Sequence, residues 1–269
     1  MERIKVALEK ARQEREGASS EQPARPATDR SAAAPSAATT DITYTQTRTA
    51  KVSPLLLKRN RIISAQSERD YNDAYKMLRT QVLQRLKENH WNVLAVTSPG
   101  EDEGKTLTAI NLAASLALEI SHTVLLVDAN LRHPSIHERL GLPPADGLSE
   151  YLLDNADLQD LLIHPEGLDH VVLLPAGRSL QNSAEMLNSP RMAELVSELK
   201  NRYPERIVIF DLPPILSAAD AIAFAPLVDA ALLVLEEGRT RQEDAKRALE
   251  LLDCTNVIGT VLNKVGQDD

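Results

Sequence analysis

The sequence predicts an α/β domain in which a mainly parallel β-sheet carries helices on both faces. Short, almost continuous apolar segments alternate with segments of helical spacing, a pattern typical of a parallel sheet buried on both sides. A glycine-containing loop ending in Gly104, Lys105 and Thr106 joins the first apolar strand of this pattern to a helix. Two later strands end in an aspartate, Asp128 and Asp211. Because ligands of such sheets bind at the carboxyl ends of the strands, the loop and both aspartates should share one crevice.

The first 51 residues differ in composition from the rest of the chain. Residues 2–16 have the spacing of a short helix, which would either dock on a partner or fray as a tail. Residues 17–51 are mostly Ala, Ser, Thr and Pro with few large apolar side chains, so we expect a disordered linker in which Tyr44 is accessible. The α/β domain is then predicted to span residues 52–269.

Within the domain, residues 52–61 show no regular spacing and are expected to lie on its surface, whereas residues 68–88 have the spacing of an amphipathic helix. The predicted strands are residues 93–96, 123–127, 171–174, 206–210, 230–235 and 257–262. The remaining predicted helices are residues 105–120, 135–140, 149–153, 158–163, 183–187, 190–201, 218–224 and 240–253.

Charge and cysteine content narrow the class of protein. Residues 1–70 carry 13 basic and 9 acidic side chains, while the remainder carries 17 basic and 30 acidic ones. An acidic main body argues against nucleic-acid binding, and the basic first segment is either a solvated tail or a contact for acidic lipids or a partner. Cys254 is the only cysteine and no apolar run reaches the ~18 residues of a spanning helix. We therefore expect a soluble, cytoplasmic protein whose membrane contact is peripheral or through a partner.

The loop between the first strand and its helix has the chemistry of a phosphate-binding loop. Its backbone N–H groups and the helix N-terminus favour an anion at one place. Lys105 would reach the outer phosphates and the Thr106 hydroxyl would ligate Mg²⁺. The usual spacing would put a glycine at position 99, but Pro99 is there and Gly100 follows it. Residues 101–103, Glu-Asp-Glu, add three carboxylates beside the expected triphosphate.

The strand-end aspartates supply the carboxylates that such a site needs. Asp211 is the natural ligand of the magnesium ion, and Asp128 could bind the metal or accept a proton from an attacking hydroxyl. The alternative for each is a turn aspartate that caps the following segment. Arg132 could meet a phosphate oxygen or a neighbouring subunit. His133 and His137 stand four residues apart, but no third ligand in register supports a zinc site.

Several segments resemble the cytoplasmic domain of bacterial tyrosine kinases, the BY-kinases of the CpsD/CapB type, over about residues 52–264. The resemblance is nearest to forms whose membrane activator is a separate polypeptide. The segments that carry it are AVTSPGEDEGKTLTAINLAASLA, TVLLVDANLRHPSIHERLGL, LPAGRSLQNSAEMLNSPRMAELVSEL, RIVIFDLPPILSAADAIAFAPLVDAALLVLEEGRT, VIGTVLNKV and DAYKMLRTQVL.

This resemblance implies the P-loop NTPase fold of the SIMIBI/MinD-like group and Mg-ATP-dependent phosphorylation of tyrosine in trans within a ring of subunits. It also implies a Wzz-like membrane activator and control of exopolysaccharide or capsule polymerisation and export. The implied catalytic residues are Lys105, Asp128 and Asp211, and the implied metal ligands are Thr106, Asp128 and Asp211. The implied ATP-binding residues are Gly100, Asp102, Glu103, Gly104, Lys105, Thr106, Leu107 and, beside the base, Asn263. The implied subunit contacts are Asp73, Lys76, Arg79 and Arg132.

The sequence departs from the family pattern in four places. Asp102 stands where the family loop has a glycine, and Asn130 stands where a second aspartate is expected. Lys76 replaces an arginine and loses its two-pronged geometry. The five tyrosines, at positions 44, 71, 75, 151 and 203, form no C-terminal cluster. The acceptor would then be Tyr44 or a tyrosine of a partner.

Other functions remain open from the sequence. A ParA/MinD-like ATPase switch would carry a lysine near the start of the loop, where this chain has Gly100 and no lysine from residue 91 to 104. A nucleotide-binding scaffold with little catalysis is consistent with Asp102 and Asn130. A structural domain without nucleotide is hard to reconcile with three motifs that converge at strand ends.

Overall fold

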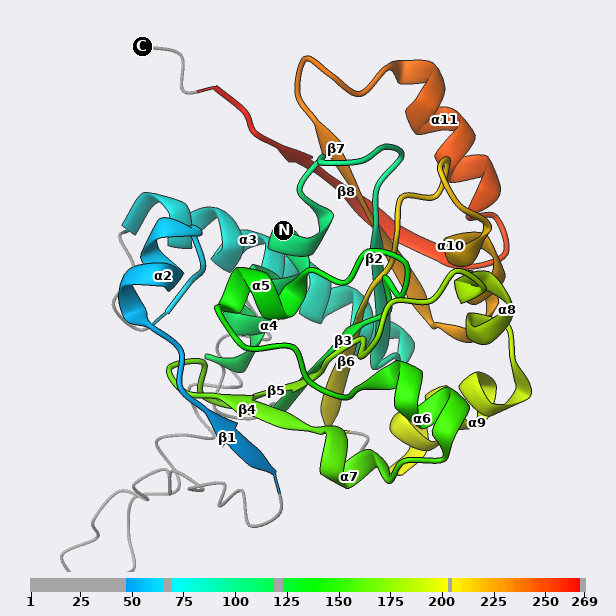
Figure 1. The fold of residues 1–269 in the computed structure, drawn as a ribbon. Coiled ribbons are helices and arrows are strands. Elements are labelled where there is room, and N and C mark those ends of the chain that lie inside the picture. Colours follow the sequence, from blue (N-terminus) through cyan, green and yellow to red (C-terminus); the bar gives the residue numbers. More distant parts are fainter. Residues whose placement is uncertain (1–46, 65–68, 119–122, 203–204, 267–269) are drawn as a thin grey trace, which may run out of the picture. The chain divides into compact units, whose positions relative to one another are not determined.

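The computed structural model describes residues 47–64, 69–118, 123–202 and 205–266 (Figure 1). The helix predicted at residues 2–16, most of the linker predicted at residues 17–51, and Tyr44 lie outside the described residues.

An eight-stranded sheet forms the centre of the described domain, in the order β1-β4-β5-β3-β6-β2-β7-β8. Neighbouring strands run parallel except for β4 and β5, the antiparallel pair among these strands. The six strands expected from apolar runs are all present, with ends that differ by at most one residue. The strands are β1 (Arg48–Ala50), β2 (Val93–Thr97), β3 (Thr123–Asp128), β4 (Ile163–Pro165), β5 (Val171–Leu174), β6 (Arg206–Asp211), β7 (Ala230–Glu236) and β8 (Asn256–Asn263).

Both faces of the sheet are covered because successive side chains of its central strands are buried on opposite sides. In β2, Leu94 and Val96 join one apolar cluster, while Val93 and Ala95 join the other. The first cluster packs under α2 (Pro54–Arg59), α3 (Arg69–Asn89), α4 (Lys105–Ala117) and α5 (Ile136–Leu140). The second packs under α6 (Leu148–Asp154), α7 (Leu158–Leu161), α8 (Ser183–Leu187), α9 (Pro190–Arg202), α10 (Ala219–Phe224) with the 3-10 turn Ala225–Leu227, and α11 (Gln242–Leu251). The predicted α/β class is confirmed.

The structure differs from the sequence prediction at the edge of the sheet that contains β1. Residues 48–50 pair with β4, although the sequence places them in the linker, and residues 54–59 form α2 where no regular element was expected. The helix predicted over residues 158–163 ends at Leu161, and Ile163 begins β4. Elements of three to six residues are too short to show a periodicity, so tertiary pairing decides them.

The chain's turns bring the strand ends to a common edge. Asp128 and Asp211 are register partners on the adjacent strands β3 and β6, and Val96 of β2 is opposite Asp211 on the other side. The phosphate-loop candidate follows β2 directly, so it stands next to both aspartates. No helix in the described part of the chain has both the length and the apolarity to cross a membrane.

Candidate functional site

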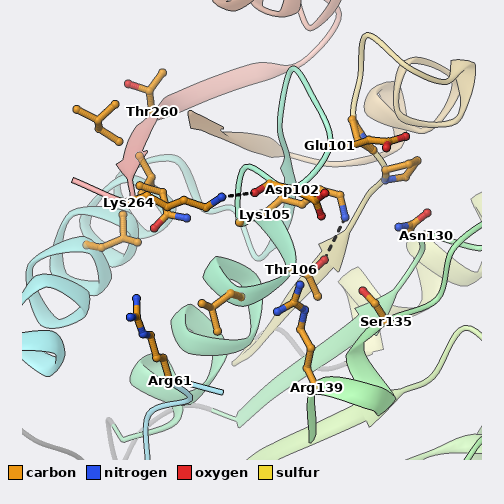
Figure 2. Close-up of a pocket in the computed structure, with 18 of the residues that line it drawn as sticks. Arg61, Glu101, Asp102, Lys105, Thr106, Asn130, Ser135, Arg139, Thr260 and Lys264 are labelled. Carbon is orange, nitrogen blue, oxygen red and sulfur yellow. Dashed lines mark hydrogen bonds between the residues drawn. The ribbon is translucent and has the colours of Figure 1, made fainter. Parts of the chain in front are cut away.

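A cleft of about 1570 Å³ opens at this edge of the sheet, between the loop after β2, α3, the segment before and within α5, and the end of β8 (Figure 2). The predicted ATP-binding residues that line it are Asp102, Gly104, Lys105, Thr106, Leu107 and Asn263. Gly100 and Glu103 belong to the same loop but do not line the cleft. The convergence expected from strand ends is therefore present.

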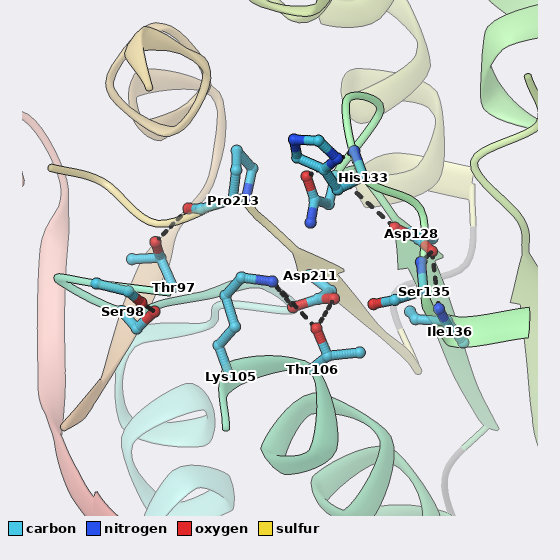
Figure 3. Close-up of polar contacts among 12 residues, drawn as sticks. Thr97, Ser98, Lys105, Thr106, Asp128, His133, Ser135, Ile136, Asp211 and Pro213 are labelled. Carbon is cyan, nitrogen blue, oxygen red and sulfur yellow. Dashed lines mark hydrogen bonds and ion pairs between the residues drawn. The ribbon is translucent and has the colours of Figure 1, made fainter. Parts of the chain in front are cut away.

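A compact polar centre lies at the N-terminus of α4 (Figure 3). The Thr106 hydroxyl donates to Oδ2 of Asp211 at 2.7 Å, and Nζ of Lys105 donates to the Thr106 hydroxyl at 3.0 Å. Nζ of Lys105 also lies 3.7 Å from Oδ1 of Asp211. Lys105, Thr106 and Asp211 thus meet at one point, and Asp211 is fully buried there.

This centre fits a divalent cation. Oδ1 of Asp211 is buried and accepts no hydrogen bond among the described residues. A buried carboxylate oxygen without a donor is costly unless a cation or a water supplies the missing partner. Asp211 and the Thr106 hydroxyl are oxygen ligands of the kind that Mg²⁺ prefers, so the residues fit that ion.

Asp128 is held by the backbone of the segment that follows it. Its Oδ2 accepts the N–H groups of Ser135 and Ile136, each at 3.0 Å, and its Oδ1 accepts the N–H of Asn130 at 3.2 Å. Burial and the neighbouring Asp211 carboxylate raise the pKa of Asp128 from 3.8 to about 7. Burial likewise raises the pKa of Asp211, although Lys105 opposes that rise. Two carboxylates are thus close enough to disfavour each other's charge.

The raised pKa of Asp128 predicts how stability depends on pH. An acid whose pKa is higher folded than unfolded holds its proton more tightly in the folded state, so the free energy of unfolding should fall between pH 4 and 7. The rise from 3.8 to about 7 corresponds to at most roughly 4 kcal/mol. Asp128→Asn should flatten this slope, because asparagine does not titrate. The variant should still fold, since its amide oxygen can accept from Ser135 and Ile136. Urea unfolding of the nucleotide-free protein at pH 5 and pH 8 measures the effect. An unchanged slope in the variant would contradict it.

Glu103 braces the phosphate-loop candidate rather than facing the cleft. Its carboxylate accepts the N–H of Gly100 at 2.9 Å and the hydroxyl of Thr240 at 2.5 Å. Asn263 at the end of β8 donates to the carbonyl of Glu103 at 2.9 Å, and Lys264 donates to the carbonyl of Asp102 at 2.7 Å. The Glu103 carboxylate therefore stabilises the loop, and Asn263 and Lys264 connect the loop to the last strand.

Asp102 has the left-handed backbone conformation, with φ of 60°, which explains why glycine suits this position. Asp102→Asn tolerates the same φ and removes an exposed charge next to the Lys105 site. We expect it to tighten ATP binding by on the order of threefold at low salt, with the gain fading at high salt. Titration with a fluorescent nucleotide at both salt concentrations tests this. Asp253→Asn is the control that should leave ATP affinity unchanged. Asp253 is exposed and precedes β8, at the end of this strand that does not line the cleft.

Two other positions noted in the sequence, Arg132 and Asn130, have partners in this structure. Arg132 lines the cleft, but its guanidinium turns to the carbonyl of Gln181 at 3.3 Å and to the Asp220 carboxylate at 3.9 Å. Asn130 lines the cleft as well, and its amide oxygen lies 3.4 Å from the N–H of His133.

Three of the four predicted subunit-contact residues, Asp73, Lys76 and Arg79, lie on α3. Asp73 and Lys76 are exposed and form an ion pair at 2.7 Å. Arg79 donates to the carbonyl of Ser115 in α4 at 3.0 Å, so its guanidinium packs within the domain.

Sequence reasoning missed three cations of the cleft, Arg61, Arg139 and Lys264. Lys264 follows the end of β8, where the strand-end rule would have found it. Arg139 lies inside a short helix, and nothing in its local spacing indicates which way its side chain points.

Sequence comparison finds relatives of known activity, although no family model matches the chain. Tyrosine-protein kinase YwqD of Bacillus subtilis is 32% identical over 209 residues, which cover 77% of this chain and 86% of YwqD. The succinoglycan biosynthesis transport protein ExoP of Rhizobium meliloti is 32% identical over 78% of this chain, but the match spans only 27% of ExoP.

Comparison with solved structures agrees. The kinase domain of the Escherichia coli tyrosine kinase ETK superposes with a TM-score of 0.67 and 26% identity, covering 82% of this chain and 92% of that domain. Cobyrinic acid a,c-diamide synthase from Mycobacterium smegmatis, solved with an ATP analogue and magnesium, gives a TM-score of 0.54 at 22% identity, over 64% of this chain and 74% of that one. The second likeness shows the fold alone. The fold is therefore that of P-loop NTPases.

Proposed function

Because the chain belongs to the family of bacterial tyrosine kinases, we propose that it transfers a phosphoryl group from ATP to tyrosine hydroxyls of proteins at this cleft. The observation that supports this most is the pair of buried carboxylates, Asp128 and Asp211, beside Lys105 and Thr106. One carboxylate is enough to hold a metal ion, and the second is then available to act on a hydroxyl acceptor.

Each residue of the centre has a role in this proposal. Thr106 and Asp211 would hold Mg²⁺, with Asp128 close enough to contribute directly or through water. Lys105 would bind the outer phosphates, and the backbone of residues 100–107 would cradle the others. Asn263, which holds the loop through the carbonyl of Glu103, would lie beside the base.

The reaction needs charge stabilisation and a proton acceptor. When bound, Mg-ATP supplies the phosphoryl group, whose bond to the ADP oxygen breaks as a bond to the tyrosine oxygen forms. The tyrosine hydroxyl loses its proton in this exchange, and Asp128 would take it, since its carboxylate is the register neighbour of Asp211 at the metal-binding centre. Lys105 stabilises the negative charge that develops on the transferred group.

The polysaccharide pathway and the partners belong to the same proposal. ExoP carries a polysaccharide biosynthesis role in its name, and this chain matches only 27% of its length. We also propose that the protein acts at the inner face of the cell membrane, activated by a Wzz-like membrane protein on a separate chain, in control of exopolysaccharide or capsule polymerisation and export. Its copies would form a ring through Asp73, Lys76, Arg79 and Arg132, and no nucleic acid would be involved.

The experiment that tests the function uses the full chain with Mg-ATP, with and without the cytoplasmic part of its membrane partner. Phosphotyrosine, located by mass spectrometry, supports a kinase and identifies the acceptor, with Tyr44 and partner tyrosines as candidates. Release of ADP without phosphotyrosine would instead identify an ATPase switch. Binding of ATP with neither product would identify a nucleotide-binding scaffold.

A further inference from the structure

Arg139 is a cation of the cleft without a role in the reaction described above. It lies on α5 and lines the cleft, and its side chain points toward Thr106 (Figure 2). Its Nε is buried and has no hydrogen-bond partner, and the guanidinium makes no ion pair within the described parts of the chain. An arginine in such a position is expected to meet an anion that comes from outside the chain.

Three other cations that line the cleft are already engaged by the protein. Lys105 contacts Thr106 and Asp211. Arg132 contacts Gln181, Ser183 and Asp220. Lys264 contacts the carbonyl of Asp102 and the carboxylate of Glu236. Arg139 differs from these because its guanidinium has no hydrogen-bond or ion-pair partner among the described residues.

The backbone around Arg139 is fixed at both ends of its short helix. Asp128 accepts the N–H groups of Ser135 and Ile136 where α5 begins. Where α5 ends, the side-chain amide of Asn60 donates to the carbonyl of Arg139 at 2.6 Å. The carboxylate that would act on the acceptor therefore also helps to fix the backbone that carries Arg139, before any ligand arrives.

The charge of Arg139 reaches the metal-binding centre. Its side chain points toward Thr106, whose hydroxyl contacts Asp211 at 2.7 Å. Lys105 approaches this centre from α4, whereas Arg139 approaches it from α5. A ligand group between them would contact both cations. In Mg-ATP, the group next to the metal and beyond the loop is the terminal phosphoryl group.

We propose that Arg139 contacts the terminal phosphoryl group of ATP, as a catalytic residue supplied by the same chain rather than by a neighbouring subunit. This rests on the proposed function. Arg139 would distinguish ATP from ADP and would stabilise the negative charge on the phosphoryl oxygens while the bond to ADP breaks and the bond to tyrosine forms. A planar guanidinium can bind two of these oxygens at once, which a lysine at this position cannot do.

The test compares nucleotide affinities, so it does not depend on turnover. Arg139→Gln should weaken binding of an ATP analogue with a non-cleavable β–γ bridge by about tenfold or more, while ADP affinity stays within about twofold. The affinity of Arg139→Lys for the ATP analogue should lie between those of the wild-type protein and Arg139→Gln. In the kinase assay Arg139→Gln should lower phosphotyrosine formation by about a hundredfold or more. Calorimetric titration in the presence of Mg²⁺ measures both affinities.

The matched control is Arg202→Gln, a change to an exposed arginine of α9, which should leave both affinities unchanged. Equal losses for ATP analogue and ADP, or no loss for either, would overturn the assignment of Arg139, as would a wild-type protein that does not bind ATP. A melting temperature for each variant separates lost contacts from lost folding, and Arg139→Lys keeps the test informative if Arg139→Gln unfolds. If the affinity difference holds but wild-type protein makes no phosphotyrosine, only the proposed kinase activity fails.

Discussion

Replacing Lys105 with methionine should lower tyrosine phosphorylation by at least about a hundredfold, the largest effect expected in this protein. Lys105 is the cation of the phosphate loop, and its Nζ already lies within 3.0 Å of the Thr106 hydroxyl and 3.7 Å of Asp211. Methionine keeps the length of the side chain and removes the charge that would bind the outer phosphates. The measurement is the initial rate of phosphotyrosine formation at saturating Mg-ATP, together with nucleotide affinity.

Lys200→Met is the comparison for this change. Lys200 forms an ion pair with Asp229 on the other side of the domain from the cleft, so its loss should affect stability and leave the phosphorylation rate nearly unchanged. A Lys105→Met protein that keeps its full rate would show that the loop is not the site of transfer.

Asp211→Asn should produce the second largest effect, a loss of at least about a hundredfold in rate that excess magnesium does not restore. Asp211 is fully buried, and its Oδ1 lacks a hydrogen-bond donor among the described residues. Asparagine fits the same space but supplies no negative charge to a cation. Binding of ATP without magnesium should persist or strengthen, because a negative charge near the phosphates is gone. Magnesium titrations of nucleotide affinity separate these two effects.

Asp229→Asn provides the matched buried aspartate. Asp229 accepts the N–H groups of Asn92 and Val93, each at 3.1 Å, and pairs with Lys200. Its replacement should cost about 1–3 kcal/mol of stability without changing the magnesium dependence. If Asp211→Asn and Asp229→Asn altered magnesium binding alike, Asp211 would be a structural residue only.

Much of the fold follows from local patterns in the sequence. Six of the strands are apolar runs such as TVLLVD and RIVIFD. A parallel sheet that is buried on both faces needs apolar side chains on both sides of its strands, so such runs predict these strands directly. The loop at Gly104, Lys105 and Thr106 and the aspartates at the ends of β3 and β6 meet because parallel strands bring their carboxyl ends to one edge. These features depend on neighbours in sequence and on one rule of topology, so the sequence by itself determined them.

Other features depend on contacts between distant segments, and only the tertiary structure decided them. Glu103 turns from the phosphates because Gly100 and Thr240, 137 residues away, donate to it. Asp128 acquires a raised pKa because it is buried against Asp211. Arg139 lines the cleft from a backbone that Asp128 and Asn60 fix at the two ends of α5. Burial, charge and side-chain direction arise from segments that meet only in the folded chain, and no local spacing records them.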